Sequence, residues 1–98
     1  MVPIKVIVEL EAKPGGRAEL KSLMERIVAE QGSSQNGFLG STRYEALDNP
    51  DLLIEIADWE SADARTAHMQ ESVATGVYEP VMDMLATPIR ATVIRELS

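Results

Sequence analysis

The spacing of apolar residues changes in a definite order along this 98-residue chain, and that order limits the folds the chain can adopt. Apolar residues at every second position are typical of strands, whereas a spacing near 3.6 residues is typical of amphipathic helices. Together with turn residues, these patterns predict strands over 4–10, 38–46, 52–59 and 89–97, and helices over 17–31, 62–70 and 78–86. Gly32 is placed to end the first helix, Ser61 is placed to cap the second, and Gly76 interrupts the chain between the second and the third.

The resulting order, β-α-β-β-α-β, predicts a ferredoxin-like α+β fold with an antiparallel four-stranded sheet and helices on one face. The strand over 52–59 is apolar on both sides. Its two faces carry Leu52, Ile54 and Ile56 against Leu53, Ala57 and Trp59, with Glu55 in the second set. Because helices can cover only one face of the sheet, we expect two copies to pack sheet to sheet as a homodimer with a barrel-like core.

The strand over 38–46 is predicted to be polar on one side. Strict alternation assigns Phe38, Gly40, Thr42 and Tyr44 to one face and Leu39, Ser41, Arg43 and Glu45 to the other. The short turn Asp48-Asn49-Pro50-Asp51 then makes this strand and the next an antiparallel hairpin.

Composition and length exclude several classes of protein. A net charge of −7 argues against binding to nucleic acids or to an anionic membrane surface, since both require clustered positive charge. The chain has no cysteine, which excludes disulfides, thiolate metal sites and a cysteine nucleophile. It has no linker, no secretory signal pattern and no apolar stretch near the ~20 residues of a membrane helix. We therefore expect a single domain over 1–98, located in the cytoplasm.

Several short motifs resemble one protein family across nearly the whole chain. They are Asn36-Gly37-Phe38-Leu39-Gly40, Tyr44-Glu45, Asp48-Asn49-Pro50, Asp58-Trp59-Glu60-Ser61, and Ala64 with His68. Together they resemble the antibiotic biosynthesis monooxygenase domain, a family of dimeric α/β barrels. The most specific mark is Trp59 followed nine residues later by His68.

The resemblance implies a fold more firmly than a reaction. Some members oxidise aromatic polyketides or quinols with O₂ and without metal or flavin, some degrade haem through a helix histidine, and others have no known reaction. We therefore expect a cofactor-independent monooxygenase acting on a phenolic, quinol or polycyclic aromatic molecule. Two alternatives are a non-catalytic ligand-binding or dimerisation module, and a haem protein using His68. The haem-degrading relatives have an asparagine at the position that aligns with Val8, which counts against haem degradation.

Three residues are candidates for catalysis. His68, the only histidine, suits a base or hydrogen-bond partner of a phenol, because imidazole titrates near neutral pH; a structural histidine is the alternative. Trp59 could stack on a flat ligand or simply anchor the core. Arg43 could stabilise a developing anion, although it could equally pair with Glu45 or Glu55.

Three further residues are candidates for substrate binding. Tyr44 lies next to Arg43 in the predicted strand, so the two point to opposite faces unless the strand bulges. Tyr78 follows Gly76 and could gate a pocket, whereas partly exposed packing is the ordinary alternative. Met82 belongs to a set of methionines that could form an adaptable apolar wall or an ordinary core. No metal site and no bound cofactor are expected, since one histidine without suitably spaced carboxylates makes no zinc site.

Overall fold

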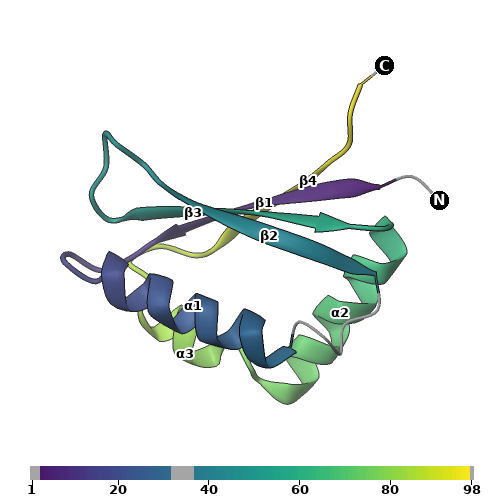
Figure 1. Cartoon of the computed structure of the whole chain (residues 1–98). Helices are drawn as coiled ribbons and strands as arrows, with labels where there is room; N and C mark the ends of the chain where they lie inside the picture. Colours follow the sequence, from purple (N-terminus) through teal and green to yellow (C-terminus); the bar gives the residue numbers. More distant parts are fainter. Residues whose placement is uncertain (1–2, 32–36, 98) are drawn as a thin grey trace.

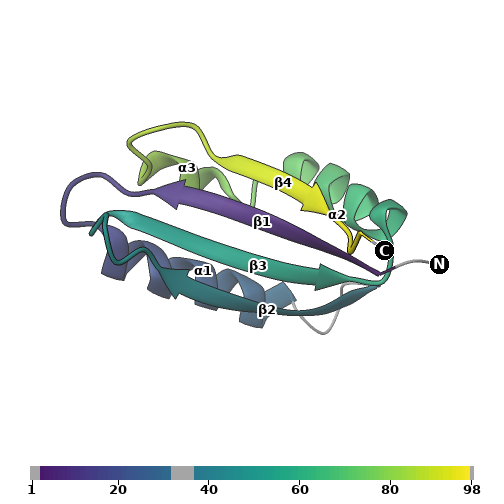
Figure 2. The same cartoon turned by 90° about the horizontal axis from the view of Figure 1, so that it is seen from above.

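The computed structural model describes residues 3–31 and 37–97, and within them the elements follow the expected order (Figure 1). They are β1 (Ile4–Glu11), α1 (Arg17–Gln31), β2 (Phe38–Glu45), β3 (Leu52–Trp59), α2 (Ala62–Thr75), α3 (Glu79–Asp83) and β4 (Arg90–Ile94). The strands form one antiparallel sheet in the order β2-β3-β1-β4, with β1 and β3 in the centre (Figure 2). The predicted ferredoxin-like α+β fold is thereby confirmed.

All three helices of the described residues lie on the same side of the sheet, which leaves the opposite face open (Figure 1). The register of β1 and β3 pairs Ile4 with Trp59 and Val6 with Ala57 on the covered face. It pairs Ile7 with Ile56 on the open face. The division of β1 and β3 into two faces is therefore as predicted from the alternation.

The predicted faces of β2 are wrong at its first residues. Phe38 lies opposite Trp59 and Gly40 lies opposite Asp58, so an irregularity between Phe38 and Gly40 adds one residue to this strand. Gly40 has φ 134°, a backbone conformation that suits glycine. As a result Phe38 joins the covered face and Tyr44 stays on the open face.

The predicted ends of the last elements also need correction. The second helix continues to Thr75 rather than residue 70, and it ends where Gly76 adopts φ 68° and donates its N–H to the carbonyl of Ser72. The third helix covers only Glu79–Asp83, because the chain beyond it turns back along the end of β1. There Ala86 donates its N–H to the carbonyl of Glu11. Gly32, predicted to end the first helix, lies outside the described residues.

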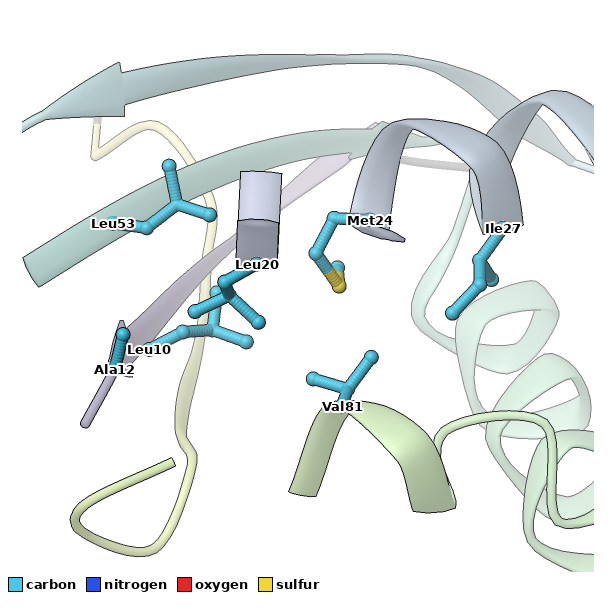
Figure 3. Packing of buried hydrophobic residues seen from close by; sticks show 7 residues of the cluster. All are labelled: Leu10, Ala12, Leu20, Met24, Ile27, Leu53 and Val81. Carbon is cyan, nitrogen blue, oxygen red and sulfur yellow. The ribbon is translucent and has the colours of Figure 1, made fainter. Parts of the chain in front are cut away.

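The buried core lies between the sheet and the helices at one end of the molecule (Figure 3). Its members come from β1, β3, α1 and α3, and they are Leu10, Ala12, Leu20, Met24, Ile27, Leu53 and Val81. A second cluster around Trp59 lies farther along the same face, where Ile4, Val6 and Ala57 complete it. The first cluster holds α1 and α3 on the sheet, and the second leads to α2. Within the described residues, no helix is long and apolar enough to cross a membrane.

The two glycines Gly15 and Gly37 provide a matched test of the packing between β2 and α2. Both have positive φ, 80° and 87°, so alanine at either should cost about 1–2 kcal/mol of backbone strain. Only at Gly37 would an added Cβ also meet a neighbour, the Cβ of Ala64, at 2.6 Å. We expect Gly37→Ala to lower the free energy of unfolding clearly more than Gly15→Ala, measured by urea denaturation. Equal losses would contradict the close packing of Gly37 against α2.

Candidate functional site

A cavity of about 360 Å³ lies between the covered face of the sheet and the helices, within the size range of small-molecule sites. Most of its lining is apolar and comes from β1, β3, α1 and α2, with contributions near α3 and β4. Six of the lining residues are polar or charged: Glu55, Arg65, His68, Ser72, Tyr78 and Glu79. Trp59 also lines it, so the cavity brings Trp59 and His68 together. A second, shallower hollow between α1 and α3 holds none of the predicted site residues.

The position of His68 follows from the two ends of α2. The Oγ of Ser61 accepts a hydrogen bond from the N–H of Ala64, which fixes the start of the helix as predicted. Gly76 fixes its end. Between them His68 and Ser72, one turn apart, are the buried residues of the helix. The helix therefore presents an imidazole and a hydroxyl toward the sheet.

Aromatic rings form one wall of the site. The rings of Trp59 and His68 are 5.1 Å apart at an angle of 33°, and Phe38 packs on the other side of Trp59 at 5.2 Å. The ring of Tyr78 meets His68 edge-on, with centroids 6.3 Å apart. Such a surface favours flat, unsaturated ligands, because aromatic rings prefer offset or edge-to-face contacts with one another.

His68 Nε2 lies between two hydroxyl groups. It is 3.3 Å from Ser72 Oγ and 3.4 Å from Tyr78 Oη. A neutral imidazole nitrogen carries either one proton or one lone pair, so these hydroxyls share a single bonding position. Burial lowers the pKa of His68, while Glu71 opposes the shift and Arg65 adds to it, so the ring is neutral at pH 7. Burial and the nearby Glu55 raise the pKa of Tyr78, which keeps its hydroxyl protonated.

Glu55 is a charged residue on an otherwise apolar stretch of the covered face. Its side chain is 9% exposed, and its Oε2 lies 3.2 Å from Arg43 Nε, which belongs to β2. Burial raises the pKa of the Glu55 carboxyl, and the Arg43 guanidinium opposes this shift without cancelling it. The acid thus combines burial, an adjacent cation and a position in the cavity wall, the features that accompany functional carboxylates.

The structure brings four of the six predicted site residues to the cavity: Trp59, His68, Tyr78 and Met82. Arg43 contacts Glu55 but is not part of the lining, so its interaction is the ion pair considered as the alternative. Tyr44 lies on the open face of the sheet and is 50% exposed, on the side away from the cavity. The predicted role of Tyr44 in substrate binding therefore has no support from this cavity.

Sequence reasoning missed Glu55 and Ser72 as site residues. A signal for Glu55 was present, because it occupies an inward position in the alternation of β3. Ser72 lies one helical turn after His68, but the helix was expected to end before it. Among residues 3–31 and 37–97, no three His, Asp or Glu side chains gather in a way that could hold a metal ion.

Comparison with known proteins places this chain in a family. The family model described as antibiotic biosynthesis monooxygenase matches residues 3–75. No curated protein matches significantly. The chain therefore belongs to the antibiotic biosynthesis monooxygenase family, as the sequence motifs indicated.

Solved structures share the fold at low sequence identity. SnoaB from Streptomyces nogalater, described as a cofactor-independent oxygenase, is 16% identical with a TM-score of 0.83, over 100% of this chain and 96% of SnoaB. Rv0793 from Mycobacterium tuberculosis is 22% identical with a TM-score of 0.79, over 98% of this chain and 96% of that one. A conserved protein from Methanosarcina mazei is 18% identical with a TM-score of 0.83, over 99% and 95%.

The raised pKa of Glu55 predicts how stability depends on pH. The carboxyl of Glu55 binds its proton more tightly in the folded protein than in the unfolded chain, so low pH favours the folded state. This stabilisation is lost as the pH rises through the pKa of Glu55 in the folded protein. Each unit of pKa difference corresponds to about 1.4 kcal/mol. Glu55→Gln removes the titration.

We therefore expect the unfolding free energy of the wild type, relative to Glu55→Gln, to fall as the pH rises above the ordinary glutamate pKa of about 4.3. Denaturant titrations at several pH values measure this difference. The exposed residue Glu30 gives the control variant Glu30→Gln, for which no such trend is expected. A constant difference between wild type and Glu55→Gln would contradict the burial of an ionisable carboxyl.

Proposed function

We propose that this protein is a cofactor-independent monooxygenase that oxidises a phenolic, quinol or polycyclic aromatic small molecule with O₂. The observation that carries the proposal is a cavity of about 360 Å³ lined by both Trp59 and His68. Membership of the antibiotic biosynthesis monooxygenase family supports the reaction class. The likeness to SnoaB, itself described as a cofactor-independent oxygenase, agrees with it at the level of the fold.

The lining of the cavity suits a flat aromatic substrate. Trp59 and His68 offer ring surfaces, and Met24, Met69 and Met82 offer flexible apolar side chains. The hydroxyls of Tyr78 and Ser72 both lie within hydrogen-bond distance of His68 Nε2. Either hydroxyl can therefore give up its hydrogen bond to His68 and form one with the substrate instead. We assign His68 the role of a neutral hydrogen-bond partner that orients these hydroxyls around the bound ring.

In the proposed reaction, loss of the phenolic proton makes the ring electron-rich enough to reduce O₂. One electron passes from the phenolate to O₂, and the resulting radical and superoxide combine to form a carbon–oxygen bond. The oxygenated ring carbon then loses its hydrogen as a proton while the O–O bond breaks, which leaves one oxygen atom in the product as a carbonyl. The other oxygen atom departs as water with this proton and the phenolic one. The protein contributes by holding the reactants together and by excluding bulk water from the charged intermediates.

Oxygen uptake with a panel of naphthols and hydroquinones tests the proposed activity. We expect uptake with a subset of the panel, reduced roughly 100-fold in His68→Ala, because misplacing the substrate by about 1 Å can cost that much. Thr66→Ala, at an exposed position of α2, is the matched control and should keep the wild-type rate. If the wild type consumes no more oxygen than His68→Ala with any compound, the monooxygenase proposal fails. Tight binding without uptake would instead support a non-catalytic binding module.

We further propose that the chain acts as a homodimer that buries the open face of the sheet. This face carries a central apolar patch made of Ile7, Leu52, Ile54, Ile56 and Ile94. On the same face, Lys5 and Glu9 flank Ile7 along β1 and form ion pairs with Asp58 and Arg90. An apolar patch with a charged rim is typical of a protein interface, and its burial contributes about 25 cal/mol per Å².

Light scattering at low micromolar concentration measures the assembly. The wild type is expected at twice the chain mass of 10.7 kDa. Ile56→Glu places a charge in the middle of the patch and should give a monomer, because an unpaired buried charge is costly. Leu47→Glu makes the same kind of change at a loop position that is already 94% exposed, and it should leave the dimer intact. A wild type of single-chain mass would refute the proposed assembly.

A further inference from the structure

Glu55 occupies a place in the sheet where a charge is costly. On the covered face it lies opposite Val8 of β1, between Leu53 and Ala57 of its own strand. Only 7% of the residue is exposed, and the side chain lines the cavity. Burying a carboxylate without full hydrogen bonding is costly, so such a residue needs a compensating partner.

Arg43 compensates the charge only in part. The contact of 3.2 Å between Arg43 Nε and Glu55 Oε2 is close enough for an ion pair, but it does not have hydrogen-bond geometry. Within the described residues, Oε2 accepts no hydrogen bond from another protein group, and Arg43 Nε and Nη2 donate none. The carboxylate therefore retains acceptor capacity in a cavity wall, where a donor on a ligand can use it.

We propose that Glu55 accepts the proton of the substrate's phenolic hydroxyl, and that the site consequently selects neutral aromatic hydrogen-bond donors over aromatic anions. The inference rests on the proposed function and names the proton acceptor and the substrate class for it. In the step, the phenolic O–H bond breaks, the proton passes to a carboxylate oxygen of Glu55, and the electron pair stays on the phenolate oxygen.

The charge balance of the site suits this step. Before transfer the negative charge is on Glu55, and afterwards it is on the substrate, so the Arg43 cation faces one negative charge throughout. The other ionisable groups of the cavity are His68 and Arg65 from α2, together with Tyr78 and Glu79. The facing residues of β1 and β4, Val8 and Ala91, are apolar.

Glu55 suits the role of acceptor better than His68 does. The Nε2 atom of His68 is already within hydrogen-bond range of two hydroxyls, so it has no separate position for a substrate proton. Burial lowers the pKa of His68 and raises the pKa of Glu55, so the imidazole and the carboxyl differ less in basicity here than they do in water. In this assignment His68 helps to orient the ring of the substrate, and Glu55 accepts the phenolic proton.

Binding without oxygen tests the selectivity separately from any reaction. We expect the wild type at pH 7.5 to bind 1-naphthol at least tenfold more tightly than 1-naphthoate under anaerobic conditions, measured by calorimetry. Glu55→Gln leaves Arg43 without its anion and should reverse or abolish this preference. Glu30→Gln, which neutralises an exposed carboxylate of α1 outside the cavity lining, is the control and should keep it.

The double variant Arg43→Leu/Glu55→Gln removes both charges and covers the case in which Glu55→Gln alone does not fold. It should bind naphthol and naphthoate with affinities within about threefold of each other. A preference for naphthol that persists in Glu55→Gln, or in the double variant, would overturn the proposal. These binding results are informative even if no compound of the panel is oxidised.

Kinetics test the proton transfer itself. With a compound that the wild type oxidises, Glu55→Gln should lower kcat 100-fold or more while KM changes little. It should also abolish the fall of kcat at low pH, where the wild-type carboxylate becomes protonated. A kcat within threefold of wild type would overturn the role of Glu55 and leave the monooxygenase assignment standing, whereas absence of wild-type turnover would refute that assignment alone.

Discussion

The antiparallel pairing of β1 with β3 is the interaction on which the rest of the molecule depends. These strands form the centre of the sheet, and their register places Leu10 beside Leu53 at one end of the covered face and Ile4 beside Trp59 at the other. At the first end, α1 and α3 close over the sheet with fully buried side chains such as Leu20 and Val81. At the second end the sheet and the helices enclose the cavity instead. The same strand pair thus supplies both the rigid core and the wall of the site.

The position of the cavity determines its electrostatics. A carboxylate on the central strand is removed from solvent by the helices, and its ionic partner among the described residues, Arg43, comes from the neighbouring edge strand β2. The two hydroxyls and the imidazole come from α2 and from the segment that follows it. Polar groups from the sheet and from the helices therefore face each other across an apolar space. In such a space Coulomb interactions are much stronger than in water, so a single charge can decide which ligand binds.

The amount that could be predicted differed between the elements for physical reasons. In β1 and β3 each apolar residue has a definite face, so alternation alone yields the two faces of each strand and the prediction of an uncovered apolar face. In β2 the extra residue near Gly40 shifts the alternation, and nothing in the local pattern marks it. Trp59 and His68 could be placed together from the family motifs. The alternation of β3 places Glu55 on the inward face. Whether it meets a cavity there depends on the path of α2 and of the segment after it, and the periodicity of the sequence does not specify that path.

The two faces of β3 link the proposed site to the proposed assembly. Glu55 points into the cavity, and the next residue, Ile56, belongs to the apolar patch on the open face. In a strand, neighbouring side chains point in opposite directions and share one backbone, so packing on the open face restrains the strand that carries the carboxylate. A central strand has no solvent-exposed edge through which it could shift, because both sides are hydrogen-bonded to β1 and β2. Burial of the open face by a second copy would therefore hold Glu55 more firmly against Arg43, without any contact between the two copies at the cavity itself.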